Sequence, residues 1–499
     1  MKYIIVFLLI MIESFASTLQ LSISSNPSKL NPLIATDSAS GQIADWVFDA
    51  LITYDKDGKI KPALATSYEF VNDTTLLFHL RKDVKWSDGK PFGADDVVFT
   101  YKLITSPKIF TPYASEFRYV KAVKALDTYT LEVTYKEPYF KALETWMMSI
   151  VPKHILAGEK DIMTSSFNQH PIGTGKYTLK GFEISKDIIL HANANYFEHK
   201  PNIDTLTYHF IPDPATEFLM LKSGKLDVGS LSPLQIERQI DSDFKSKYNI
   251  YEKISQSYTY MGFNLENPKF KNPKVRQALS LALDRQEMVD ILFFGHGEVC
   301  RGPFMPGTFA FNDQIQAPKQ NLTKAKALLK EAGYDDGHPL AFEIVTNSNN
   351  KTRVYATQII QHQLKKIGVK VTIRAMEWQA FLNTVVNPRK YEAIVLGWGL
   401  GLMPDAYSIW SGESDKKGGF NFVHYHNAKV DALIKKAEKT VDRAKLGLIY
   451  KEIFSLIVKD NPYLFLYIPN AITVVNRNIK NVSPSMIGVM HNVIDWVKP

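Results

Sequence analysis

A change of hydrophobic period recurs along the second half of this chain and sets narrow limits on its fold. Apolar residues recur every three or four positions over 275–283, 325–332 and 360–367. Short apolar runs with the spacing of a strand occupy 342–345 and 369–373, between and after these segments. A helix buries residues at a period of 3.6 and a strand at a period of two. Strands that alternate with helices predict an α/β lobe with sheets in its core.

Helix boundaries can also be read from this part of the sequence. Asn272 and Pro273 are typical of an N-cap followed by the first helical residue. Gly333 and Gly368 stand where a left-handed residue ends a helix. Two further helical stripes occupy 430–437 and 449–457, before an apolar strand at 463–467.

The chain is too long for a single hydrophobic core. Its 499 residues exceed the roughly 250–300 at which single cores stop growing, so two or more lobes are expected. Hydrophobic residues make up 45% and charged residues 22%, which excludes a disordered chain and a polytopic membrane protein. The sequence contains no repeat, low-complexity tract or long linker, which favours lobes joined by crossing strands that act as a hinge.

The first hundred residues predict a shorter succession of elements. A strand at 19–24 is followed by a loop, because Asn-Pro pairs break the pattern at 26–27 and 31–32. Helical spacing predicts a helix over 41–52, closed by a turn at 54–58. Strict alternation at 76–80 predicts a strand with Leu76, Phe78 and Leu80 on one face.

The N-terminus has the pattern of a secretory signal. Lys2 precedes an apolar run at 4–12, and 14–16 presents small residues before a cleavage site after Ala16. The run is too short to span a bilayer, which takes about 20 residues, and no later stretch reaches that length, so a soluble mature protein is expected. A buried N-terminal strand and an uncleaved anchor remain alternatives.

The single cysteine limits the covalent chemistry of an exported protein. Cys300 lies far from the signal, so a lipoprotein anchor, which needs a cysteine at the cleavage point, is excluded. No internal disulfide can form, and stability must come from core burial. We expect Cys300 to pack as a small apolar residue, with a reactive thiol as the alternative.

The formal net charge of +8 raises nucleic acid or an anionic membrane as partners. Lys and Arg are, however, mixed with Asp and Glu throughout. The densest clusters, 365–366 and 435–436, lie on the outer faces of amphipathic helices. We interpret them as solvated faces and expect no nucleic-acid partner.

No set of catalytic residues stands out, so we predict neither an enzyme nor a cofactor. The nucleophile elbow, phosphate loop and paired-cysteine motifs are absent. The glycines at 173–175 favour a tight turn over a phosphate site, and the acidic pairs 95–96 and 335–336 favour capping over acid-base chemistry. His79 has no His or Cys partner at metal spacing, which favours a structural histidine. His424 and His426 lack a third ligand, which favours a surface or cleft role over a metal site.

Aromatic residues and glycines gather between 378 and 425. Tryptophans, tyrosines and phenylalanines there surround Gly397, Gly399 and Gly401. Glycines let a ligand approach the backbone and aromatic rings offer flat apolar walls, so a ligand wall is our interpretation, with a core cluster as the alternative.

Longer motifs resemble a known family. ALATSY at 63–68, LLFHLRKDVKWSDGKPF at 76–92 and ADDV at 94–97 are close to the signature of the family 5 extracellular solute-binding proteins, the dipeptide and oligopeptide receptors of ATP-binding-cassette importers. Supporting matches follow in family order: 171–177, 192–197, 275–279, 324–334, and 397–398 through 404–405. The resemblance covers nearly the whole mature chain.

The resemblance implies a two-lobed α/β periplasmic binding protein fold of type II, in the large peptide-binding class. A first lobe would comprise 17–263 and 477–499, with an inserted subdomain at about 50–170, and a second lobe 264–476. The crossing segments would be 258–264 and 472–476. Such a protein would close over a solute and deliver it to a membrane permease, and we expect a periplasmic monomer.

The resemblance also implies the ligand contacts. The loop Leu33, Ile34, Ala35 and Thr36 and the segment Trp398, Gly399 to Gly401 would be strand edges that hold a peptide backbone. The remaining implied contacts are side chains that line pockets or the far end of the ligand: Trp378, Trp398, Tyr407, Asn347 and Asn349.

One departure concerns the ligand's amino group. Family peptide receptors place an aspartate three residues after the tryptophan matched by Trp398, and this chain has Gly401 there. Asp405 is a possible substitute. An oligosaccharide, a nickel-type metal chelate and, from another class, the substrate of a secreted hydrolase remain alternatives.

Overall fold

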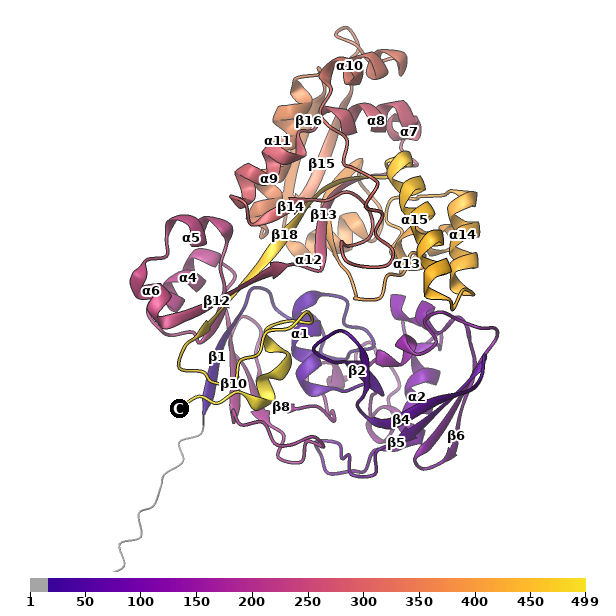
Figure 1. Cartoon of the computed structure of the whole chain (residues 1–499), viewed down its shortest axis with the longest axis vertical. Helices are drawn as coiled ribbons and strands as arrows, with labels where there is room; N and C mark the ends of the chain where they lie inside the picture. The colour runs from indigo at the N-terminus through magenta and orange to yellow at the C-terminus, as the bar shows by residue number, and fades with distance from the viewer. Residues whose placement is uncertain (1–16) are drawn as a thin grey trace, which may run out of the picture.

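The computed structural model describes residues 17–499, and the predicted signal segment lies outside these residues. Figure 1 shows two bodies: a lower one formed by the indigo and purple part of the chain and an upper one formed mainly by the pink and orange part. A smaller helical unit projects at the left, and a long yellow strand runs from the upper body to the lower one.

The lower body contains a four-stranded sheet of order β1-β10-β9-β8. The first strand is parallel to its neighbour and the others are antiparallel: β1 (Thr18–Ile23), β10 (Thr205–Phe210), β9 (Ile188–Ala192) and β8 (Tyr177–Phe182). Leu19, Leu21 and Ile23 of β1 are buried, so the strand predicted at 19–24 is confirmed.

The first helix is shorter than predicted. α1 (Ser38–Val47) begins where the Asp37 carboxylate accepts a hydrogen bond from the amide of Ser40 (2.9 Å) and ends at an extended Phe48. The prediction of a helix over 41–52 was therefore wrong at both ends, because Leu51 is buried in an extended segment that leads into a strand. Gly173 lies against the end of this helix, where a Cβ would come 1.8 Å from the carbonyl oxygen of Val47. The glycines at 173–175 thus serve close packing before β8.

A subdomain follows α1 in the chain and forms the right side of the lower body. Its strands are a hairpin, β2 (Ile52–Tyr54) and β3 (Ile60–Pro62), and an antiparallel sheet of order β4-β5-β7-β6: β4 (Ala65–Asn72), β5 (Thr75–Leu80), β7 (Thr130–Tyr135) and β6 (Val120–Asp127). Its helices are α2 (Ala94–Ile104) and α3 (Lys153–Leu156). Leu76, Phe78 and Leu80 are buried on one face of β5, as predicted.

The helical unit at the left has a small core of its own. Its elements are α4 (Pro214–Lys222), β11 (Val228–Ser230), α5 (Pro233–Arg238), α6 (Ser242–Lys247) and β12 (Tyr248–Ile254). Asp227 accepts a hydrogen bond from the amide of Gln20 in β1 (2.8 Å), and Glu217 accepts one from the hydroxyl of Ser22 (2.6 Å). These bonds attach the unit to the lower body.

The upper body combines six strands with helices on their faces. The strands are β13 (Ser257–Phe263), β14 (Gly297–Val299), β15 (Ala341–Asn347), β16 (Lys370–Met376), β17 (Ala393–Gly399) and β18 (Tyr463–Asn476). The helices are α7 (Pro268–Lys271), α8 (Pro273–Ala282), α9 (Arg285–Phe293), α10 (Leu322–Glu331), α11 (Lys351–Lys365), α12 (Trp378–Phe381), α13 (Tyr407–Trp410), α14 (Ala428–Glu438) and α15 (Arg443–Asp460). Short 3₁₀ helices occupy Pro112–Phe117, Glu144–Met147, Ser166–Asn168, Gly412–Ser414 and Met490–Asp495, and Leu382–Val386 is a π-helix.

The helix boundaries predicted for this body are confirmed. Asn272 caps α8 by accepting a hydrogen bond from the amide of Lys274 (3.0 Å). Gly333 and Gly368, which follow α10 and α11, have φ of +89° and +80°. Leu279 and Leu364 are among the fully buried residues of the predicted stripes, so local capping and burial agree.

One strand belongs to both bodies. The first half of β18 pairs with β13 and β14, and the second half pairs with β11 and β12. The chain crosses back between β12 and β13, where Ile254 pairs with Asn470. The two crossings lie near Ile254 and Asn470, whereas the sequence places the crossing segments at 258–264 and 472–476, and the lobe boundaries stay a prediction.

The single cysteine lies in the core near this connection. Cys300 is 2% exposed, and its thiol contacts the carbonyl oxygen of Gly302 (3.4 Å). Burial raises the pKa of the thiol to about 12, which keeps it protonated and unreactive. Packing as a small apolar residue is therefore confirmed.

Candidate functional site: a cavity between the two lobes

A cavity of about 1100 Å³ lies between the lower and upper bodies. The lower wall is formed by the end of β1 and the starts of α1, α4 and α5, with Ser24, Asp37, Asp213 and Leu234. The upper wall is formed by α9, α11 and the end of β15, with Ile291, Phe294, Asn347, Arg353, Tyr355 and Trp378. Because both bodies contribute walls, a solute held here contacts both of them.

Arg353 is the unusual group in this wall. Its amide donates to the Asn350 side chain that caps α11 (2.9 Å), and one guanidinium nitrogen donates to Oδ1 of Asn347 (3.1 Å). Its Nε is buried with no hydrogen-bond partner among residues 17–499, and no carboxylate of these residues forms an ion pair with it. Burial lowers the pKa of Arg353, yet a guanidinium stays charged at neutral pH.

The neighbouring strand makes room for this guanidinium. A Cβ on Gly397 of β17 would come 2.6 Å from a terminal nitrogen of Arg353 and 2.9 Å from the carbonyl oxygen of Tyr258. Any larger residue at 397 would displace the arginine. A glycine in a strand interior often marks such a close approach, and here the approaching group is a cation.

Arg353 is not among the residues predicted from the sequence, although the sequence contains a signal for it. Arg353 stands in the first turn of α11, directly after the Asn350 cap. The helix dipole disfavours a cation at that end of a helix. A cation kept in an unfavourable position indicates a role other than helix stability.

Three predicted site residues lie in this wall. Asn347 is buried at the end of β15 and donates to the side chain of the exposed Asn349 (2.6 Å), and both line the cavity. Trp378 begins α12 and lines the same cavity. The structure thus brings these three residues together with Arg353.

The segment after Trp398 offers a free strand edge. On one side β17 pairs with β13 along its length, and on the other it pairs with β15 only at Ala393 and Ile394. Within the described chain no strand pairs with this second edge beyond Ile394. Gly399 and Gly401 are exposed, with open space where a Cβ would stand.

The ring of Trp398 itself is part of an aromatic stack. It lies parallel to Phe422 with centroids 5.4 Å apart, and its Nε1 donates to the hydroxyl of Tyr463 (3.2 Å). Tyr260 stacks on the same Tyr463. The cluster therefore combines the two alternatives left open by the sequence, with packed rings and an exposed backbone edge.

The other predicted edge, Leu33 to Thr36, is folded into a turn. The amides of Ile34 and Ala35 donate to the carbonyl oxygen of Asn31, and the carbonyl oxygen of Ala35 accepts from the hydroxyl of Tyr113 (2.7 Å). Leu33, Ile34 and Ala35 are buried, and Thr36 alone is exposed. None of the four lines the cavity, although the next residue, Asp37, does.

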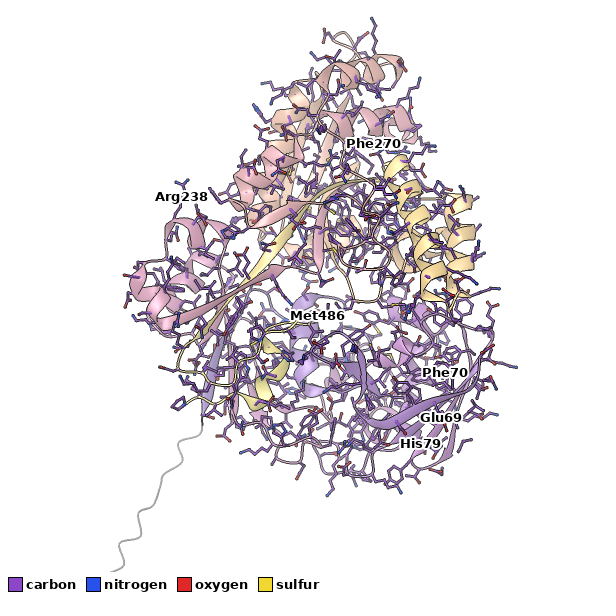
Figure 2. The ribbon with its side chains drawn as sticks, in the orientation of Figure 1. Glu69, Phe70, His79, Arg238, Phe270 and Met486 are labelled. Carbon is purple, nitrogen blue, oxygen red and sulfur yellow. The ribbon has the colours of Figure 1, made fainter. Side chains whose placement is uncertain are left out.

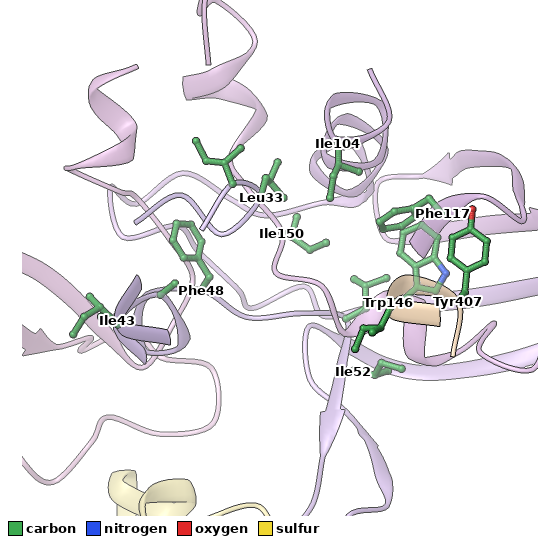
Figure 3. Packing of buried hydrophobic residues seen from close by; sticks show 14 of the residues in the cluster. Leu33, Ile43, Phe48, Ile52, Ile104, Phe117, Trp146, Ile150 and Tyr407 are labelled. Carbon is green, nitrogen blue, oxygen red and sulfur yellow. The ribbon is translucent and has the colours of Figure 1, made fainter. Parts of the chain in front are cut away.

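Asp405 and Tyr407 lie elsewhere, where the subdomain meets the upper body. One oxygen of Asp405 receives the ammonium of Lys141 from the lower body (2.7 Å), and the other accepts from the amide of Tyr407 (2.9 Å). Arg118 lies 3.7 Å above the ring of Tyr407. Figure 3 shows Tyr407 beside Phe117 and Trp146 of the subdomain. Both oxygens of Asp405 are thus already occupied by groups of the chain.

The histidine and acidic alternatives have structural explanations. His424 and His426 both contact Oδ2 of Asp415, at 2.9 and 2.8 Å. His79 is exposed on the subdomain sheet near Glu69, as Figure 2 shows. Across residues 17–499 no group of three His, Cys, Asp or Glu side chains could hold a metal ion. Asp96 accepts from the amide of Gly93 (3.1 Å), which is the capping role expected of it.

The sequence profile of the bacterial extracellular solute-binding proteins, family 5 (middle), matches residues 59–420. The chain belongs to this family. It is 34% identical to the oligopeptide-binding protein AppA of Bacillus subtilis, over 94% of this chain and 89% of AppA. The predicted family is therefore confirmed.

Solved structures of family members have the same fold. AppA from Bacillus subtilis in complex with a nonapeptide has a TM-score of 0.90 and 32% identity, covering 97% of this chain and 99% of AppA. NikZ from Campylobacter jejuni in complex with Ni(L-His) has a TM-score of 0.87 and 29% identity, covering 97% and 100%. DppA from Helicobacter pylori in complex with the peptide STSA has a TM-score of 0.85 and 26% identity, covering 94% and 96%. The predicted two-lobed α/β binding-protein fold is confirmed.

The family also bears on where the chain works. Its members are extracellular solute-binding proteins by description. In the described part of the chain, no helix has both the length and the apolar character required to cross a bilayer.

Proposed function

We propose that this chain is the solute-binding receptor of an ATP-binding-cassette importer, that it captures peptides in the cavity between its lobes, and that it does so without cleaving them. The observation that carries the proposal is Arg353, whose half-buried side chain lies on the wall of a cavity lined by both lobes and has no carboxylate partner among the described residues. A partly buried cation without a counter-charge favours a ligand carboxylate, which would form charge-assisted hydrogen bonds with the guanidinium.

The free edge of β17 supports a peptide as the ligand. An extended peptide can add to a strand edge through main-chain hydrogen bonds, which do not depend on one side-chain sequence. The exposed Gly399 and Gly401 leave space for that backbone. The cavity volume of about 1100 Å³ is slightly above the range of roughly 300–1,000 Å³ for small-molecule sites, which favours a short peptide over a single amino acid.

In this proposal the carboxyl end of the peptide meets Arg353, and Asn347, Asn349 and Trp378 surround that end. The amino end is not held by Asp405, since Lys141 occupies that carboxylate. A solute that touches both walls favours the closed arrangement of the lobes, which is the state a permease would recognise. Export by a signal cleaved after Ala16, without a lipid anchor, and a periplasmic monomer are part of the proposal.

Calorimetry with matched peptides tests the role of Arg353. Peptides of three to nine residues are titrated as free acids and as C-terminal amides. Charge-assisted hydrogen bonds contribute about 1.5–3 kcal/mol, so amidation should weaken binding by roughly 10- to 150-fold. In Arg353→Gln the acid and the amide should bind equally, whereas Lys365→Gln, which removes an exposed cation at the other end of α11 that does not line the cavity, should keep the difference.

Two outcomes would contradict the proposal. Peptide acids and amides that bind equally to the unmodified protein would exclude Arg353 as the carboxylate site. Binding of no peptide, together with binding of Ni(L-His), would favour the chelate alternative, because His362 lines the same cavity as Arg353. Mass spectrometry of peptides after incubation checks that they remain intact.

A further inference from the structure

A histidine beside the hinge contacts two carboxylates at once. His296 lies between α9 and β14, and its side chain is 16% exposed. Its Nδ1 is 2.8 Å from a carboxylate oxygen of Glu252, and its Nε2 is 3.0 Å from one of Glu237. Each ring nitrogen therefore faces a group that can only accept a hydrogen bond.

Only one charge state of the ring satisfies both contacts. A neutral imidazole has one N–H and one lone pair, whereas the imidazolium has two N–H groups. With the neutral ring, one of the two contacts would place a lone pair against a carboxylate. The geometry thus requires a proton on each nitrogen.

The three residues come from parts of the chain on opposite sides of the crossing strands. Glu237 is on α5 and Glu252 is on β12, both in the unit that hydrogen bonds attach to β1. His296 follows α9 of the upper body, and its carbonyl oxygen accepts from the amide of Asn470 in β18 (3.0 Å). The side chain of Asn470 also donates to Glu252 (2.6 Å). The contacts therefore connect both lobes to the strand that joins them.

Other charges near the ring have different partners. On α5, Arg238 lies 5.5 Å from the ring centroid of Phe294, and Figure 2 shows it at the left edge of the molecule. On β12, Lys253 donates to the carbonyl oxygen of Met486 (3.2 Å). Glu298 of β14 is exposed. Burial opposes the charged ring, but the hydrogen bonds and charges of Glu237 and Glu252 outweigh it and raise the pKa of His296.

We propose that His296 is a proton-dependent tie across the hinge, which holds α9 against α5 when protonated and releases it when deprotonated. Both helices line the cavity, with Leu234 on α5 and Ile291 on α9. The tie therefore sets how readily the cavity opens, whatever solute it holds. A raised pKa means that the contribution is complete below the ordinary histidine pKa of about 6.5 and is lost as pH rises through the higher pKa of the folded protein.

Distances between spin labels on the two sides of the hinge test this proposal in the solute-free protein. Ser223 after α4 and Lys366 after α11 are exposed positions for the labels. The distance distribution should shift to longer values between pH 5.5 and pH 8.5. The histidine ring signals in NMR should give a midpoint for His296 above 6.5.

Glu237→Gln is the discriminating variant. The Gln amide can donate to Nε2 of a neutral ring while Nδ1 donates to Glu252, so both contacts survive without the second proton. We expect the short distance at both pH values and a lower NMR midpoint for His296. In His296→Gln the distance should be the same at both pH values.

Two results would overturn the proposal. A distance distribution in the unmodified protein that does not change between pH 5.5 and 8.5 would exclude His296 as a proton-dependent tie across the hinge. A pH-dependent shift that persists in His296→Gln would assign the effect to another titrating group.

Discussion

Lys141 and Arg353 both lie at the boundary between the lobes, but their surroundings differ. Lys141 reaches from the subdomain to Asp405 of the upper body (2.7 Å) and also contacts Glu116 (2.6 Å), and these carboxylates hold its pKa well above the usual value against the effect of burial. Arg353 has no carboxylate partner among the described residues. The charges of one boundary region are thus neutralised within the chain, and in our proposal the other region receives its counter-charge from a ligand.

The subdomain side contains a second buried pair of the same kind. Arg118 of the lower body contacts Glu438 of α14, whose other oxygen accepts from the hydroxyl of Tyr119. The main chain adds a bond from the amide of Phe140 to the carbonyl oxygen of Glu438 (3.0 Å). Buried ion pairs and hydrogen bonds of the chain therefore connect the lobes at the subdomain. On the cavity side the lobes are connected by the hinge strands and, in our proposal, by the bound solute.

Removal of the Lys141–Asp405 ion pair should have the largest effect on the free energy of unfolding. Lys141→Met leaves Asp405 buried without its cation, and removal of one partner from a buried pair costs about 3–5 kcal/mol. The double variant Lys141→Met/Asp405→Asn should recover most of this loss, because the Asn oxygen can still accept from the amide of Tyr407. Urea unfolding, followed by tryptophan fluorescence and circular dichroism, measures both free energies of unfolding.

The exposed pair Arg374 and Glu343 supplies the control. Arg374→Met should change stability by no more than about 1 kcal/mol, since solvent screens such pairs. A loss in Lys141→Met as small as that of the control would mean that water reaches the Lys141 pair and that the two boundary regions do not differ.

Asp49 tests whether burial also destabilises the charged form of an anion. It follows α1, and burial raises its pKa to about 6, although Lys176, Thr174 and Tyr196 act in the opposite direction. In the unfolded chain the pKa is about 3.9, so the folded protein binds more protons between roughly pH 4 and 6 and loses stability as pH rises through that range. Asp49→Asn should remove this dependence and raise the free energy of unfolding at pH 7 by about 2 kcal/mol.

Urea unfolding at pH 4.5, 5.5 and 7 measures the effect. The gain in Asp49→Asn should be small at pH 4.5 and largest at pH 7. Stability curves of the two proteins that run parallel across this range would show that Asp49 is solvated and not strained. Asp73→Asn, at an exposed carboxylate in the turn between β4 and β5, is the control.

The sequence predicted the fold well because the fold depends on local rules. The cap at Asn272, the stop at Gly333 and the stripe of Leu364 each follow from neighbouring residues, and the family motifs fixed the arrangement of the lobes. The end of α1 was missed because Leu51, which is buried just before β2, gives the same apolar signal as a buried helical residue.

The candidate site could be predicted only in part. Asn347 and Trp378 were found from the resemblance, whereas Arg353 was not, since its role depends on Gly397 in a distant strand. Asp405 appeared available for a ligand amine, and the structure pairs it with Lys141, a contact between residues far apart in the sequence. Pairings of this kind are set by tertiary packing and leave no local pattern.

The smallest effect should have the opposite sign to that of Lys141→Met. Arg353→Met replaces a half-buried cation without a carboxylate partner by an apolar chain of similar length, so the solute-free protein should become more stable by about 1 kcal/mol. The protein must be unfolded and refolded in solute-free buffer first, because a ligand at 100 times its dissociation constant would add about 2.7 kcal/mol and hide the gain. Lys351→Met should stay within about 0.5 kcal/mol. A loss of stability in Arg353→Met as large as that in Lys141→Met would contradict this prediction. It would mean that the guanidinium stabilises the fold, as the lysine does, and is not available to bind a ligand carboxylate.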